Sequence, residues 1–221
     1  MPSANSYEPF ADAALDPPVG GFLHRPAGGA GDGLVLTHGA GSNCATPLLV
    51  ALAEAFADSG VTVLRCNLPY RQNRAFGPPR PGDAARDRAG LKNAVACLRN
   101  LVHGRLFLGG HSYGGRQASM LCAEESGLVD GLLLLSYPLH PPGKPEQLRV
   151  QHLPQLQTPA LFVHGTLDPF GLIEEMEAAV KLVAAKALLM RVDGAGHDLG
   201  FKGKSRREEL PSLVVSEFRK L

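Results

Sequence analysis

Leu106-Phe107-Leu108-Gly109-Gly110-His111-Ser112-Tyr113-Gly114-Gly115-Arg116 is the stretch that decides the fold. It opens with an apolar, strand-like run, and a helical pattern continues from Arg116 to Cys122. A strand, a glycine-flanked serine and a helix in this order are typical of a nucleophile elbow, G-x-S-x-G. Gly110 and Gly114 flank Ser112 at positions where a Cβ would collide with the neighbouring strand or helix. The chain has 26 glycines, so this short pattern needs support from other segments.

Composition limits the class of protein. The chain has 221 residues, of which 44% are hydrophobic and 19% charged, which suits one globular domain with a large core. We expect residues 1–18, rich in Ala, Pro and Asp, to form a poorly ordered arm or an edge segment. Residues 19–221 would then be the single domain. A net charge of +1 gives no reason to expect nucleic acid or an anionic membrane as partner.

Cofactor and targeting motifs are missing from the sequence. The four cysteines form no C-x-x-C pair, so we expect no metal and no redox centre, but buried reduced thiols in a cytoplasmic protein. The glycine-rich segment 26–33 lacks the lysine of a P-loop, and no G-x-G-x-x-G occurs, so no nucleotide cofactor is expected. No apolar run approaches the roughly 18 residues that span a bilayer, and residues 1–5 do not begin a signal peptide.

Short apolar runs alternate with helical patterns from residue 34 onward. This alternation predicts an α/β fold, in which a mostly parallel sheet carries helices on both faces. The expected strands are Val19–His24, Leu34–Thr37, Val61–Cys66, Leu106–Leu108, Gly131–Ser136, Ala160–His164 and Ala187–Val192. The expected helices are Pro47–Asp58, Ala84–Leu101, the segment after Ser112, Leu172–Val183 and Leu210–Leu221. Ligands bind at the carboxyl ends of the strands in such sheets, so chemistry is expected just after each strand.

The segment after the strand at Leu34–Thr37 is His38-Gly39-Ala40-Gly41-Ser42. Its small residues let a backbone N–H approach a ligand closely. We expect the N–H groups of Ala40 and Tyr113, the residue after the serine, to form an oxyanion hole. A plain glycine turn leading into the next helix is the equally weighted alternative.

Two later strand ends supply an acid and a histidine. Asp168 follows the strand ending at His164, and His197 follows the strand ending at Val192, flanked by glycine. Nucleophilic catalysis by the serine needs all three residue types. A neutral hydroxyl is a poor nucleophile, so a histidine must take its proton, and an acid must orient that histidine. Asp193 and Asp198 are the competing acids. Both adjoin His197 in sequence, where a side chain rarely reaches the ring, so Asp168 is preferred.

These motifs together resemble the α/β-hydrolase superfamily, in particular a compact, capless branch. The likeness rests on 36–42, 65–71, 109–116, 163–170 and 194–198 and runs from about residue 20 to the end. Dienelactone hydrolases are more distant relatives, and the hydrolase-like domain of a eukaryotic histone-acetyltransferase complex subunit is similar. The resemblance implies a triad of Ser112, Asp168 and His197. Because the nuclear relatives also act as scaffold components, it does not by itself establish activity.

Specificity is less well defined by the sequence. Tyr70 and Arg71, or Arg74, follow a strand and are candidates to bind a substrate carboxylate or phosphate, unless the loop pairs with its own acidic residues. The connection after Ser136 has about two dozen residues and is Pro-rich, so no large cap is expected and the site should be open. We therefore expect hydrolysis of a small-molecule carboxylic ester or thioester. The alternatives are a non-catalytic interaction module, or lactone opening or short-peptide hydrolysis on the same triad.

Overall fold

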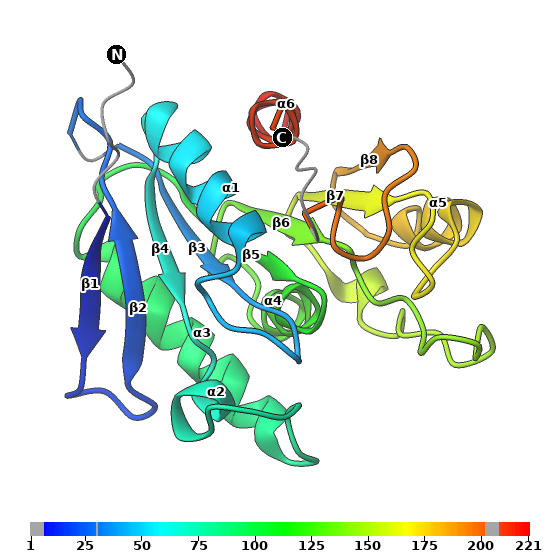
Figure 1. Ribbon diagram of the computed structural model, residues 1–221, viewed down its shortest axis with the longest axis horizontal. Coiled ribbons are helices and arrows are strands. Elements are labelled where there is room, and N and C mark those ends of the chain that lie inside the picture. Colours follow the sequence, from blue (N-terminus) through cyan, green and yellow to red (C-terminus); the bar gives the residue numbers. More distant parts are fainter. Residues whose placement is uncertain (1–6, 30, 202–207) are drawn as a thin grey trace.

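One eight-stranded sheet organises the molecule (Figure 1). The computed structural model describes residues 7–29, 31–201 and 208–221. The strand order across the sheet is β1-β2-β4-β3-β5-β6-β7-β8. The first two strands run antiparallel to their neighbours, and the other six are mutually parallel. The strands are β1 (Tyr7–Asp12), β2 (Val19–His24), β3 (Gly33–Thr37), β4 (Thr62–Cys66), β5 (Leu106–His111), β6 (Gly131–Leu135), β7 (Ala160–Gly165) and β8 (Ala187–Val192).

Helices cover both faces of the sheet. Helices α1 and α6 lie on one side, and α3 and α4 lie on the other (Figure 1). The helices are α1 (Pro47–Asp58), α2 (Pro69–Asn73), α3 (Asp83–Arg99), α4 (Tyr113–Glu124), the 3₁₀ turn η1 (Leu153–Gln155), α5 (Ile173–Val180) and α6 (Leu210–Phe218). This architecture confirms the predicted α/β-hydrolase fold, with its mostly parallel sheet and helices on both faces.

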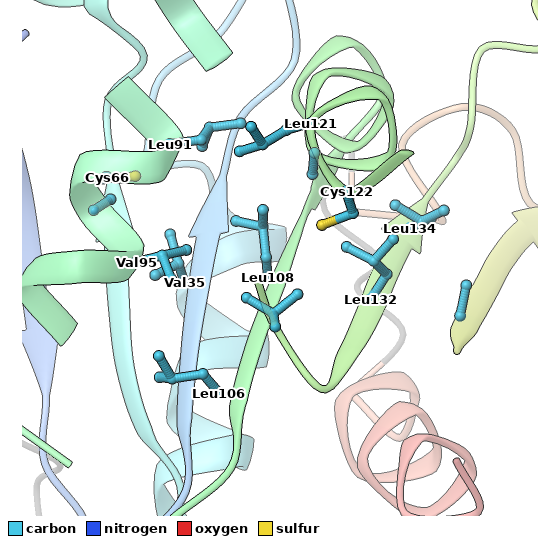
Figure 2. Close-up of a cluster of buried hydrophobic side chains, with 14 of the residues drawn as sticks. Val35, Cys66, Leu91, Val95, Leu106, Leu108, Leu121, Cys122, Leu132 and Leu134 are labelled. Carbon is cyan, nitrogen blue, oxygen red and sulfur yellow. The ribbon is translucent and has the colours of Figure 1, made fainter. Parts of the chain in front are cut away.

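The central strands are apolar throughout because they are buried on both faces. Side chains alternate along a strand, so Leu132 and Leu134 of β6 enter one core while Leu133 and Leu135 enter the other. Figure 2 shows the first core, where strand side chains meet those of α3 and α4. Each fully buried leucine contributes about 1.5–3 kcal/mol, so the sheet cannot shift its register by one residue without exposing a full row of them.

The N-terminal arm is in part an edge strand. Tyr7–Asp12 pairs with Val19–His24 along its whole length, so this part of the segment 1–18 is regular structure; residues 1–6 lie outside the described residues. The sequence pattern was too weak to predict β1, because an edge strand with one exposed face has few buried positions. The alternative of an edge segment is the one that the structure shows for residues 7–12.

The connection between β6 and β7 carries no cap. In residues 136–159 the structure has turns and one 3₁₀ turn, Leu153–Gln155. This confirms the expectation of a capless domain and leaves the carboxyl ends of β5, β6 and β7 without a covering helical layer. The sequence analysis predicted a loop for the segment that forms the short helix α2.

Candidate active site

Ser112 sits on a strained turn between β5 and α4. Its backbone has φ 52° and ψ −118°, a conformation that costs a non-glycine residue about 1–3 kcal/mol. The turn is held because the Ser112 N–H donates to the Leu135 carbonyl at 2.8 Å. A Cβ at Gly114 would lie 2.5 Å from the His38 carbonyl oxygen, and one at Gly110 would lie 2.9 Å from the backbone of Gly114. The glycines are therefore required by close backbone approach, as the motif predicts.

The structure brings Ser112, His197 and Asp168 into one chain of hydrogen bonds. The His197 Nε2 atom lies 2.8 Å from Ser112 Oγ, and His197 Nδ1 lies 2.8 Å from Asp168 Oδ2. Both ring nitrogens are thereby occupied, which leaves none for Asp193 or Asp198. This arrangement lets the imidazole exchange a proton with the hydroxyl while the carboxylate fixes its tautomer.

Asp168 is buried and held from both sides. Its Oδ1 atom accepts the Phe170 N–H at 2.9 Å, and its own N–H donates to the Gly165 carbonyl at 3.1 Å. The side chain is fully excluded from solvent, whereas that of His197 is 23% exposed. A buried carboxylate that is hydrogen-bonded in this way has one orientation, so its partner imidazole has one as well.

Two residues that the sequence analysis did not single out support His197. The His111 Nε2–H donates to the His197 carbonyl at 2.7 Å, and the Phe170 ring lies 4.2 Å from the His197 ring, centroid to centroid. Burial lowers the pKa of His111 to about 4, with the nearby His197 as a smaller cause, so His111 is a neutral donor. Its place directly before Ser112 was the available signal, but only the fold shows that the loop of His197 reaches it.

The oxyanion-hole candidates lie on adjacent segments. Ala40 follows β3, Tyr113 is the first residue of α4, and both line the cleft of Ser112. Neither N–H has an acceptor among the described residues. The Tyr113 N–H also lies at the N-terminus of α4, where the helix dipole favours negative charge.

Tyr70 and Arg71 take a role different from the expected one. The Tyr70 hydroxyl lies 3.1 Å from the Gly39 carbonyl and 2.8 Å from that of Ala40. The Arg71 guanidinium donates to the carbonyls of Ser42, Arg74, Ala40 and Gly77 at 2.8–3.3 Å. Both side chains are buried and neither lines the cleft of Ser112.

These contacts with the protein's own backbone do not support substrate binding at Tyr70 and Arg71, which stays a prediction. All three guanidinium nitrogens of Arg71 donate to backbone carbonyls, so the residue connects the 39–42 loop to the end of α2 and the segment after it. Arg74 pairs with Asp83, as the alternative of a loop paired with its own acids predicts. A buried guanidinium surrounded by carbonyl oxygens cannot be told apart from a ligand-binding one by sequence.

An open cleft of about 580 Å³ leads to Ser112. It is lined by Gly39, Ala40, Gly41, Ser42, His111, Ser112, Tyr113, Arg116, Pro138, Arg149, Phe170 and His197. A smaller pocket of about 190 Å³ shares Ser42 and His111 with the cleft and is otherwise lined by Thr46, Pro47, Leu48, Asp198 and Phe201. Residues from five different strand ends thus surround one serine.

A family described as "Alpha/beta hydrolase domain" matches residues 30–216. The chain belongs to this family. Membership supports hydrolase activity. The matched range contains every residue of the cleft, so the α/β-hydrolase domain accounts for the whole candidate site.

Solved structures agree with this assignment of the fold. Dienelactone hydrolase from Anabaena variabilis superimposes with a TM-score of 0.75 at 20% identity, covering 97% of each chain. An α/β serine hydrolase homologue from Coxiella burnetii gives 0.74 at 20% identity, over 95% of this chain and 96% of that one. A lidless α/β serine hydrolase from Xanthomonas campestris gives 0.72 at 17% identity, over 100% and 96%. At these identities the likeness shows the fold alone.

No group of three or more His, Cys, Asp or Glu side chains in the described part of this α/β-hydrolase domain is arranged to hold a metal ion. All four cysteines are free and buried, and burial raises the pKa of Cys66 and of Cys122 to about 12, so both thiols are protonated. No described helix combines the length and apolar character needed to cross a membrane.

Proposed function

We propose that the protein is a serine hydrolase that cleaves a carboxylic ester or thioester through an acyl-enzyme on Ser112. The observation that carries the proposal is the pair of hydrogen bonds that link Asp168 to His197 and His197 to Ser112, each 2.8 Å long. Ser112 lines the cleft, so a substrate carbonyl can reach it.

In the first half of the reaction, Ser112 Oγ attacks the substrate carbonyl carbon while His197 Nε2 accepts the hydroxyl proton. The carbonyl oxygen becomes an oxyanion, which the N–H groups of Ala40 and Tyr113 stabilise. The tetrahedral intermediate then collapses, the bond to the alcohol or thiol breaks, and the imidazolium returns its proton to that leaving group. Asp168 stabilises the imidazolium without taking the proton itself.

In the second half, water replaces the alcohol. His197 accepts a proton from the water as its oxygen attacks the acyl carbon, and the same N–H groups hold the second oxyanion. Collapse releases the carboxylic acid and restores the Ser112 hydroxyl. Because no cap covers the cleft, short or projecting acyl groups suit it better than long chains that need enclosure.

Fluorophosphonate labelling of the folded protein is the direct test. A fluorophosphonate phosphonylates an activated serine with loss of fluoride, so the wild type should be labelled and Ser112→Ala should not. Absence of labelling in a wild type shown to be folded would favour the non-catalytic interaction module instead.

Turnover of 4-nitrophenyl acetate tests the two partners of Ser112. Asp168→Asn and His197→Ala should each lower kcat by roughly 10³–10⁴-fold, because triad members act as a unit. Asp198→Asn serves as the control for the acid, since it neighbours His197 in sequence, and should retain most of the rate. A loss below about tenfold in either triad variant would show that the acid or base is another residue.

A further inference from the structure

Two arginines line the cleft of Ser112 from different elements. Arg116 is one helical turn beyond the serine, and its N–H donates to the Ser112 carbonyl at 3.0 Å. Arg149 belongs to the connection between β6 and β7; its N–H donates to Leu139 at 2.8 Å and its Nη1 to the Pro138 carbonyl at 3.2 Å. The backbone of both residues is therefore fixed beside the serine.

Neither arginine has a carboxylate partner among the described residues. Several arginines elsewhere do, such as Arg88 with Glu124 and Arg105 with Asp32. The buried Arg116 Nε atom has no hydrogen-bond partner at all within that part of the chain. A buried guanidinium donor that is left unpaired destabilises the protein, and a ligand oxygen would remove that penalty.

The two positive charges also act on each other. Burial, and after it the charge of Arg116, lowers the pKa of Arg149. The charge of Arg116 also opposes the effect of burial on Tyr137, whose pKa is raised to about 12. No Asp or Glu lines the cleft, so the permanent charges of its lining are those of Arg116 and Arg149, and both are positive.

We propose that Arg116 and Arg149 bind an oxyanion of the substrate, a carboxylate or a phosphate, while Ser112 attacks its ester. The inference rests on the proposed function and adds to it the class of substrate: an ester or thioester that carries a negative charge. Guanidinium groups bind such oxyanions through paired, charge-assisted hydrogen bonds. Ser112 and both arginines line one cleft, so a single small substrate can present its ester to the serine and its charged group to the arginines.

Two matched pairs of esters test the proposal. The acyl pair is mono-4-nitrophenyl adipate and its methyl ester; the leaving-group pair is 4-carboxyphenyl acetate and its methyl ester. In at least one pair, the wild type should show a kcat/KM about tenfold or more higher for the anionic ester. Arg116→Gln and Arg149→Gln should each reduce that ratio at least fivefold, mainly through KM.

Arg25→Gln is the matched control, because Arg25 pairs with Glu8 at the surface and does not line the cleft; the ratio should stay at its wild-type value. Ratios at or below one for both pairs, in a protein that hydrolyses the neutral esters, would overturn the oxyanion site and leave the serine hydrolase intact. If the folded wild type hydrolyses none of the four esters and is not labelled by the fluorophosphonate, the proposed function itself is overturned.

Calorimetric titration with adipate and with inorganic phosphate provides a readout that does not depend on turnover. Adipate binding that both arginine variants lose identifies a carboxylate site, and phosphate binding lost in the same way identifies a phosphate site. Should Arg116→Gln fail to fold, Arg149→Gln, on an irregular connection, carries the comparison. Failure of both anions to bind the wild type at millimolar concentration, with esterase ratios near one, rejects the inference.

Discussion

At the scale of single residues, the site depends on backbone positions that tolerate no side chain. Ser112 keeps a positive φ because the strand before it and the helix after it approach closely at Gly110 and Gly114. The strain is held in place by the packing on both sides. The glycines are thus part of the site, although they contribute no chemical group.

Gly114→Ala should therefore lower stability far more than an ordinary glycine substitution. The new Cβ would meet the His38 carbonyl at 2.5 Å, and overpacking of this kind costs about 3 kcal/mol. That loss corresponds to a fall in Tm of about 6–12 °C, measured by circular dichroism. Gly28→Ala is the control, since nothing lies within 4 Å of its Cβ position; equal Tm values for the two variants would contradict the packing argument.

At the scale of elements, α2 positions the loop that presents the Ala40 N–H. Tyr70 and Arg71 hold the carbonyls of that loop, while Asp87 of α3 accepts the Tyr70 N–H at 3.0 Å and the Tyr113 hydroxyl at 2.8 Å. Three helices and one loop are thus connected through buried polar contacts. Contacts of this kind, on the side of the loop away from the cleft, would keep the N–H groups of the proposed oxyanion hole in position.

Arg71→Lys separates the two roles considered for this residue. A lysine ammonium cannot match the fork of the guanidinium, which contacts four carbonyls. We expect kcat on 4-nitrophenyl acetate to fall about tenfold, with little change in KM, because the Ala40 N–H loses its support. Arg74→Lys, which keeps its charge beside Asp83, should stay near the wild type. A raised KM with unchanged kcat would return Arg71 to substrate binding.

At the scale of the whole molecule, buried neutral histidines connect neighbouring strands of the sheet, β2 with β4 and the end of β3 with the end of β4. The His24 Nε2 atom accepts the Arg65 Nε–H at 2.8 Å, and His38 Nε2 accepts the Leu68 N–H at 3.1 Å. Burial lowers the pKa of each imidazole to about 4, and nearby positive charges add to the effect. Protonation would place an N–H against an N–H at both points.

Stability should consequently fall when the pH drops below 6.5. The unfolded chain binds a proton at the ordinary histidine pKa of 6.5 while the folded chain resists until about 4, so stability is complete above 6.5 and is lost toward 4. At pH 5 the loss is about 2 kcal/mol for each histidine, so His24 and His38 together lower the Tm by about 8–16 °C. His111 and His152, whose pKa values burial also lowers to about 4, add to that loss. Thermal melts between pH 7.5 and 4.5 measure it.

The control for that measurement is His103→Gln, because His103 is exposed and its removal should leave the pH profile unchanged. His24→Gln should flatten the profile between pH 6.5 and 4. A wild-type Tm that is constant from pH 7 to pH 5 would show that neither buried imidazole resists protonation.

Much of the fold followed from the sequence because buried parallel strands are read from local pattern. The apolar runs at Leu34–Thr37 and Gly131–Ser136, and the alternation of strands with helices, predicted the sheet and its two helical layers, and the structure confirms both. The edge strand at Tyr7–Asp12 was missed as a definite element because its residues are largely exposed. The helix at Pro69–Asn73 was missed because five residues are too few to show a period.

The sequence by itself determined the elbow and the order of Ser112, Asp168 and His197. Glycine spacing and the succession of strand-like runs and motifs along the chain can be read directly from the sequence. The tertiary structure alone decided which arginines line the cleft without a carboxylate partner. Arg71, the candidate by position, is occupied by loop carbonyls, whereas Arg116 and Arg149 line the cleft without a carboxylate partner among the described residues. The reason is physical: whether a guanidinium binds its own chain or a ligand depends on which oxygen atoms folding brings within hydrogen-bond distance, and that distance is set across elements far apart in sequence.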